Sequence, residues 1–139
     1  MTPLPPPIRD LGTLLATLSV SQRPGRFCVA TATAALSVGA GVEALIVEDE
    51  GVTAVCTVDI AEGYGWDYDF VCAWLTLDVF SDLEAVGLTA AVAEVLTDAG
   101  ISCNVLAARH HDHLLVPVDR VGDAVAAIES LAGSVEEDR

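Results

Sequence analysis

The order of the elements expected in the second half of the chain is the feature that most limits its fold. Apolar residues alternate with other residues between Ala73 and Phe80, which predicts a strand. A later run of apolar residues at helical spacing stops at Gly100, a residue type that commonly ends helices. The expected elements are a strand over 73–80, a helix over 88–99, strands over 101–107 and 114–118, and a helix over 121–131. The predicted order is strand, helix, strand, strand, helix.

A ferredoxin-like unit needs one more strand after its second helix. The chain offers only an acidic tail over 134–139 there, which is a poor strand and is expected to fray. The first half contains three strand candidates, over 26–31, 44–48 and 52–58. We therefore expect an α+β fold of the ferredoxin-like βαββαβ type. Its two halves, 1–70 and 71–133, are expected to be intertwined and to share strands.

The first half shows several local boundaries. Asp10 is expected to cap a short helix with leucines on one face, and Pro24-Gly25 to end that region. Residues 49–51 have the acidic and glycine chemistry of a tight hairpin turn. The aromatic segment 62–70 is expected to be a linker between the halves whose rings cover the sheet, and the alternative is a lid over a ligand.

Charge and cysteine usage narrow the class of protein. Six basic and 21 acidic residues give a formal net charge of −15, which repels phosphate backbones and anionic lipid. We therefore expect no nucleic-acid partner and no membrane partner. The sequence contains neither a long apolar run nor the regions of a signal peptide, which favours a cytoplasmic location. The four cysteines stand singly in apolar runs, as buried cysteines usually do.

Three segments of the second half carry a family resemblance. They are Ser81 to Thr89, Gly100 to Asn104 and His111 to Pro117, in that order. Together they resemble the ACT family of small-molecule-sensing domains, and in particular short bacterial tandem ACT proteins related to the ACT units of cytosolic arginine sensors. The resemblance covers about 72–132 well and the first half loosely. It implies two βαββαβ units side by side, with an amino acid bound where they meet.

The resemblance also implies a binding site. It places the ligand at a loop whose backbone amides line the pocket, formed by Ser81, Asp82, Leu83, Glu84, Ala85, Val86 and Gly87. Asp112 would be the acidic partner of a ligand cation. The residues also favour a binding site at this loop independently of the resemblance, because a helix start exposes unpaired N–H groups that attract a carboxylate. In the alternative interpretation, Ser81 or Asp82 only caps the turn. Asn104 either contacts the ligand or satisfies a neighbouring loop.

Other chemistries are less well supported. Within His110 to His113, only His111 and His113 share a strand face, and no further pair is placed to complete a zinc site. We expect no metal, no cofactor and no catalytic residues.

The leading hypothesis is a non-catalytic regulatory protein that binds a small molecule, an amino acid by the resemblance, and forms a homodimer. The alternative is a structural or interaction module with a degenerate ligand pocket.

Overall fold

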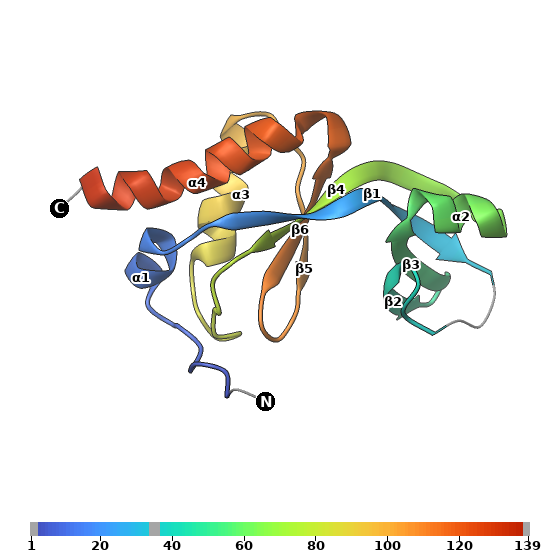
Figure 1. Ribbon diagram of the computed structural model, residues 1–139, viewed down its shortest axis with the longest axis horizontal. Coiled ribbons are helices and arrows are strands. Elements are labelled where there is room, and N and C mark those ends of the chain that lie inside the picture. The colour runs from blue at the N-terminus through green and yellow to red at the C-terminus, as the bar shows by residue number, and fades with distance from the viewer. Residues whose placement is uncertain (1–2, 34–36, 138–139) are drawn as a thin grey trace. The chain divides into compact units, whose positions relative to one another are not determined.

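A computed structural model of the protein describes residues 3–33 and 37–137 (Figure 1). The helices are α1 (Leu11–Ala16), α2 (Val58–Tyr64), α3 (Leu88–Asp98) and α4 (Val121–Glu137), with a short 3-10 helix η1 (Val118–Arg120) before the last. The strands are β1 (Val20–Ala32), β2 (Val42–Glu48), β3 (Gly51–Thr57), β4 (Tyr68–Leu77), β5 (Asn104–Ala107) and β6 (Asp112–Pro117). Within the described ranges, no helix combines the length and apolarity needed to cross a membrane.

The six strands form an antiparallel sheet in the order β2-β3-β1-β4-β6-β5. The chain divides into two compact units, of which unit 1 contains 1–23 and 74–139 and unit 2 contains 24–73. The chain passes from one unit to the other within β1 and again within β4. These two long strands therefore contribute to both units, which confirms that the two halves share strands.

Unit 2 has the strand order β2-β3-β1-β4, in which the fourth strand of a βαββαβ unit lies beside the first. Strand β3 pairs with β1 through a register that places Cys28 opposite Cys56. The β2–β3 hairpin turns at residues 49–50, as expected. The buried side chains of its core are Cys28, Ala30, Val42, Ala54, Cys56, Val58, Ala61 and Trp66.

The prediction of an aromatic linker over 62–70 is wrong. Helix α2 occupies 58–64, and β4 already begins at Tyr68. Thr57 caps the helix, because its side chain accepts a hydrogen bond from the N–H of Ile60 at 3.3 Å. Gly65 ends it in a left-handed conformation with φ of 69°. Trp66, in the short connection between α2 and β4, is buried in the core of unit 2.

Unit 1 has the strand order β1-β4-β6-β5. Strand β1 therefore supplies the closing strand that the second half of the chain lacks. The N–H of Asp78 donates to the carbonyl of Ser19 at 2.8 Å where β1 and β4 run together. Helix α4 contacts α3, α1 and β6, and Leu96 of α3 and Ile128 of α4 are fully buried (Figure 1). This confirms the predicted α+β, ferredoxin-like fold.

Several element boundaries differ from the predicted ones. Strand β1 begins at Val20 instead of at the expected residue 26. It runs through Pro24-Gly25, and Gly25 accommodates this with φ of 109°. Strand β4 runs from 68 to 77, ahead of the expected 73–80. Strand β5 begins at 104 rather than 101, because the N–H of Ile101 is held by the carbonyl of Leu96 at the end of α3.

The C-terminal segment also differs from expectation. Helix α4 continues to Glu137, so residues 134–137 of the predicted acidic tail are helical. Residues 138 and 139 lie outside the described part of the chain.

Candidate functional site

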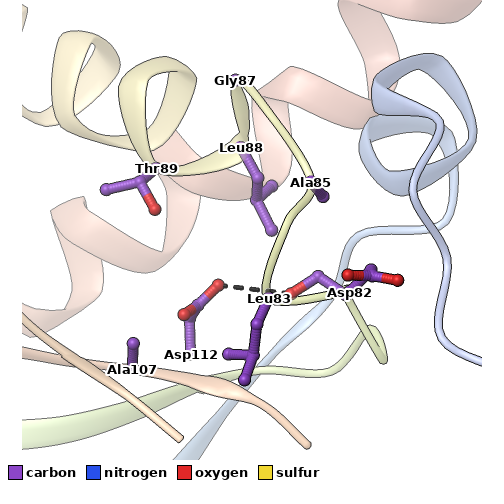
Figure 2. A pocket seen from close by; sticks show the side chains of 9 residues that line it. Asp82, Leu83, Ala85, Gly87, Leu88, Thr89, Ala107 and Asp112 are labelled. Carbon is purple, nitrogen blue, oxygen red and sulfur yellow. Dashed lines mark hydrogen bonds between the residues drawn. The ribbon is translucent and has the colours of Figure 1, made fainter. Parts of the chain in front are cut away.

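A cavity of about 170 Å³ in unit 1 lies between the β4–α3 loop and the start of β6 (Figure 2). Its lining residues are Ser81, Asp82, Leu83, Ala85, Gly87, Leu88, Thr89, Ala107 and Asp112. Six of the nine residues singled out in the sequence therefore surround one space. The other three, Glu84, Val86 and Asn104, do not line it.

The loop holds its own shape through Asp82. The carboxylate of Asp82 accepts the N–H of Glu84 at 2.8 Å, and its carbonyl accepts the N–H of Ala85 at 2.9 Å. The N–H of Asp82 itself donates to the carbonyl of Ile8 at 2.8 Å. Three loop amides are thus already bonded inside the protein. Asp82 performs the turn-capping role that the sequence left open.

The start of α3 offers the remaining amide donors. Its N-cap residue is Gly87, and no side chain makes a capping hydrogen bond there. Leu88 and Thr89, whose N–H groups lie in the first helical turn, line the cavity. Amides of a first helical turn have no acceptor within the helix, and the helix dipole favours a negative group beside them. This end of the cavity therefore suits a carboxylate.

Asp112 brings an acidic group to the opposite side. It stands at the start of β6, opposite Ala107 of β5. Its carboxylate faces the loop and accepts a hydrogen bond from the hydroxyl of Ser81 at 3.4 Å (Figure 2). Both Asp82 oxygens are turned to other groups, Glu84 N and the Arg9 side chain. Asp112 is thus the carboxylate placed to meet a cation in the cavity.

Gly87 is required at its position for a reason that the sequence alone could not show. Its φ of 107° is disfavoured for any residue with a side chain. In addition, a Cβ atom there would lie 2.8 Å from Cδ2 of Leu11 in α1. The close approach that Gly87 permits is therefore that of α1.

The three predicted site residues outside the cavity have other surroundings. The side chain of Glu84 is 81% exposed and lies 3.8 Å from Nη2 of Arg9. Val86 is 83% exposed. Asn104 is exposed on β5, where it pairs with Leu115 of β6. None of them contacts the space between Asp112 and α3.

The histidines lie on strand and turn positions near this cavity but make separate contacts. Nδ1 of His113 is 3.2 Å from Nε1 of Trp74 and 2.9 Å from Oγ1 of Thr76. Nδ1 of His111 is 3.2 Å from the carbonyl oxygen of Val79. Among residues 3–33 and 37–137, no cluster of three or more His, Cys, Asp or Glu side chains could hold a metal ion.

Burial also raises the pKa values of the cysteine thiols. Burial, followed by the proximity of Cys56, raises the pKa of Cys28 to about 12, and burial raises the pKa of Cys72 to about 11. A thiol with such a pKa carries almost no thiolate at neutral pH, so these side chains behave as small apolar residues. The Sγ atoms of Cys28 and Cys56 are 3.9 Å apart.

Three lining residues were missed from the sequence: Leu88, Thr89 and Ala107. Leu88 and Thr89 follow directly on the predicted loop, and the first helical turn after such a loop is the place where free amides occur. That signal was available. Ala107 carries no such signal, because only the pairing of β5 with β6 places it opposite Asp112.

Comparison with known proteins identifies the family. Residues 6–73 and residues 70–130 each match a family described as ACT domain. The chain belongs to the ACT domain family. It is a tandem ACT domain protein, and neither match is to a catalytic domain. No curated protein matches the chain.

Several solved structures are similar to the chain. The chain is 35% identical to Vibrio cholerae VC0802, described as a protein of unknown function and possible transport protein, with a TM-score of 0.78 over 88% of this chain and 95% of that one. It shares its fold with Agrobacterium tumefaciens Atu0741, at 20% identity, a TM-score of 0.63 and coverage of 83% and 89%. Escherichia coli aspartokinase III, in complex with aspartate and ADP, matches at 14% identity and a TM-score of 0.53, over 82% of this chain and 32% of that one.

Proposed function

We propose that this tandem ACT protein binds an amino acid in the cavity at the start of α3 and acts as a non-catalytic regulatory module. ACT domains are typically regulatory modules that bind amino acids. The observation that carries the proposal is the placement of the uncapped first turn of α3 opposite the carboxylate of Asp112, across one cavity. We also propose the division of the chain into halves 1–70 and 71–133, and a cytoplasmic location.

The two ends of the cavity match the two charges of an amino acid. The α-carboxylate would accept hydrogen bonds from the N–H groups of Leu88 and Thr89, where the helix dipole is favourable. The α-ammonium group would bind the carboxylate of Asp112 and the hydroxyl of Ser81, which are already within 3.4 Å of each other. Leu83 and Ala107 would contact the apolar part of the ligand.

The carboxylate of Asp112 also favours one charge on the ligand over the other. Asp112 disfavours a second carboxylate on the ligand at its end of the cavity, because like charges in a partly desolvated space repel. The net charge of −15 acts in the same direction over the whole surface. A cationic amino acid such as arginine or lysine is therefore the ligand class that we propose first. Aspartate, present in the aspartokinase III structure, is the natural comparison.

The proposal is tested by a thermal-shift screen of the metal-free protein against the twenty amino acids. A ligand at about 100 times its Kd adds about 2.7 kcal/mol of stability. Asp112→Asn keeps the shape of the side chain and removes its charge, so the selective shift should fall with about a tenfold loss of affinity. Asp119→Asn, at an exposed position of η1, is the matched control and should respond like the parent. An Asp112→Asn response equal to the parent's would refute this site.

The surface of β2 supports a second proposal, a homodimer. β2 stands at one end of the strand order, and its Ile46 and Val47 are 44% and 85% exposed. A strand at a sheet edge with apolar side chains favours pairing with another strand. Sedimentation should show a concentration-dependent mass that Val47→Lys lowers. A flat ligand screen together with such self-association would favour the interaction module over the ligand-binding module.

A further inference from the structure

The segment from Pro7 to Leu11, which we term the strap, contacts the first residue of the loop 81–87, which we term the ligand loop. Ile8 forms a parallel bridge with Ser81. Its N–H donates to the carbonyl of Phe80 at 2.7 Å, and its carbonyl accepts the N–H of Asp82 at 2.8 Å. The two hydrogen bonds flank Ser81, whose hydroxyl donates to Asp112 in the cavity. The backbone of Ile8 therefore fixes the residue that begins the site.

The strap also contacts the other end of the loop. Leu11 begins α1 and lies directly against Gly87, where an added Cβ would be 2.8 Å from its Cδ2 atom. Gly87 is the N-cap of α3, so Leu11 packs directly against the start of this helix. The whole stretch from Ser81 to Gly87 is thus held between two points of the strap.

Ion pairs between the strap and the ligand loop add to these two contacts. Nε of Arg9 is 3.9 Å from Oδ2 of Asp82, and its Nη2 is 3.8 Å from Oε2 of Glu84. Both carboxylates belong to the ligand loop. Arg9 is one of only six basic residues in the chain, and it lies beside two of the 21 acidic ones. Its charge reduces the repulsion within the loop, although these exposed pairs are individually weak.

The loop has little other support on the strap side. A second cavity, of about 220 Å³, is lined there by Pro7, Phe80, Ser81, Asp82, Leu83 and Arg109. Residues 81–83 therefore separate two cavities instead of packing on a core, and Leu83 is 67% exposed. Figure 2 shows the blue N-terminal segment and α1 beside this loop. On the strap side, the bonds of Ile8 to Phe80 and Asp82 hold this wall of the site, and the Ser81–Asp112 bond holds it on the cavity side.

The fold itself does not require the Ile8 bridge. Unit 1 already has the four strands of a ferredoxin-like sheet in β1, β4, β6 and β5. The bridge between Ile8 and Ser81 lies outside these named strands. Its effect is therefore local to the loop that it pairs with.

We propose that the strap is a positioning element of the ligand site: Ile8, Arg9 and Leu11 hold the loop 81–87 in the geometry that binds the ligand. This inference rests on the proposed function. A loop that is already ordered loses less conformational entropy when a ligand binds, so the strap raises affinity without touching the ligand. By linkage, a bound ligand must stabilise the strap on the loop to the same extent.

The test compares Ile8→Pro with Ile8→Ala. Proline removes the N–H that bonds to Phe80, whereas alanine keeps that N–H and shortens the side chain. Ile128→Val, in the buried core of unit 1, provides a control for general loss of stability. Hydrogen exchange of the amides in 81–87 is measured without ligand. Binding of L-arginine, L-aspartate, L-leucine and L-threonine is measured by titration calorimetry.

We expect Ile8→Pro to speed exchange in 81–87 by about tenfold while the amides of α4 keep their parent rates. The affinity of whichever probe binds the parent should fall by about threefold to tenfold in Ile8→Pro, and by less than twofold in the two controls. Added probe should also slow exchange at Ile8 in the parent.

Two results would overturn the inference. One is loop exchange in Ile8→Pro that equals the rate in Ile8→Ala. The other is an equal loss of probe affinity in Ile128→Val, which would mean that affinity follows general stability. If none of the four probes binds the parent, the proposed function fails for those ligands. The exchange measurement still decides whether the strap holds the loop.

Discussion

At the scale of single residues, His113 is surrounded by groups that require a neutral ring. The indole N–H of Trp74 can only donate, so Nδ1 of His113, 3.2 Å away, is the acceptor and carries no proton. Burial is the main reason that the pKa of His113 is lowered, and the nearby Arg23 and His111 lower it further, while Asp112 opposes them. The guanidinium carbon of Arg23 lies 4.2 Å from the centre of the Trp74 ring.

This environment makes stability depend on pH. The folded state lowers the pKa of His113 below the unfolded value of about 6.5, so the unfolded chain binds the proton first as the pH falls. Stability should therefore decrease as the pH drops below about 6.5 and level off below the folded pKa. Urea unfolding at pH 7.5 and 5.5 measures the difference. His113→Gln keeps an acceptor for Trp74 but cannot titrate, and its pH-dependent loss should be smaller. An equal loss in both proteins would show that other groups cause it.

Gly87 gives a second residue-level prediction. Gly87→Ala should lower the free energy of unfolding by about 2 kcal/mol, because its φ of 107° is strained for alanine and its Cβ would press on Leu11. Gly122→Ala in α4 is the matched control, since an added Cβ there meets no atom within 4 Å. Alanine should stabilise α4 slightly. Chemical denaturation measures both, and a neutral Gly87→Ala would contradict the contact described for the start of α3.

At the scale of elements, α2 shows what one capping residue contributes. Thr57 ends β3 and accepts the N–H of Ile60, while its own N–H donates to the carbonyl of Gly41 at 2.9 Å. Thr57→Ala should cost about 1 kcal/mol of stability, and Thr57→Ser should retain most of it. Urea unfolding of the three proteins measures this. If serine and alanine are equally destabilising, packing of the Thr57 methyl group matters more than the cap.

Helix α2 was not predicted, and its length and surroundings explain why. Its signals were present in the sequence: Thr57 as cap, Asp59 in the first turn and Gly65 after the last. The helix has only seven residues, however, and the aromatic run that follows it alternates with aspartate and glycine. Over such a short length, helical periodicity is hard to separate from other patterns. Helix α3, with eleven residues and a clear stop at Gly100, was predicted almost to the residue.

The candidate site was predictable to the extent that its residues are neighbours in the sequence. The loop from Ser81 to Gly87 and a capping role for Ser81 or Asp82 follow from the strand-to-helix turn, and the structure assigns the cap to Asp82. The contacts of Ile8 with this loop were not predictable, because they join segments more than 70 residues apart and leave no periodic signal. The same holds for Leu11 against Gly87, which are also more than 70 residues apart.

At the scale of the whole molecule, the sharing of strands between the two units follows from the sequence, because the second half lacks a closing strand. The second half predicts a strand, helix, strand, strand and helix, but no closing strand. Strand β1 supplies it, and the bond from Asp78 to Ser19 marks the pairing. In unit 2, β4 has the closing role and β1 the opening one. In the described part of unit 2 the order is β1-β2-β3-α2-β4, so β1 opens unit 2 and completes the sheet of unit 1, while β4 closes unit 2 and opens the second half.

This topology predicts that the second half cannot fold by itself. A fragment of residues 71–139 contains β5, β6, α3 and α4 but lacks β1, so the β1-facing edge of β4 has no partner. It also lacks Leu14 and Leu18, which are buried in the full chain. We expect circular dichroism to show little cooperative unfolding for this fragment, against one sharp transition for the full chain. Addition of a peptide spanning 3–25, which carries α1 and the first part of β1, should restore structure. A fragment that unfolds cooperatively without the peptide would show that the shared strand is dispensable, and that each half is an independent folding unit.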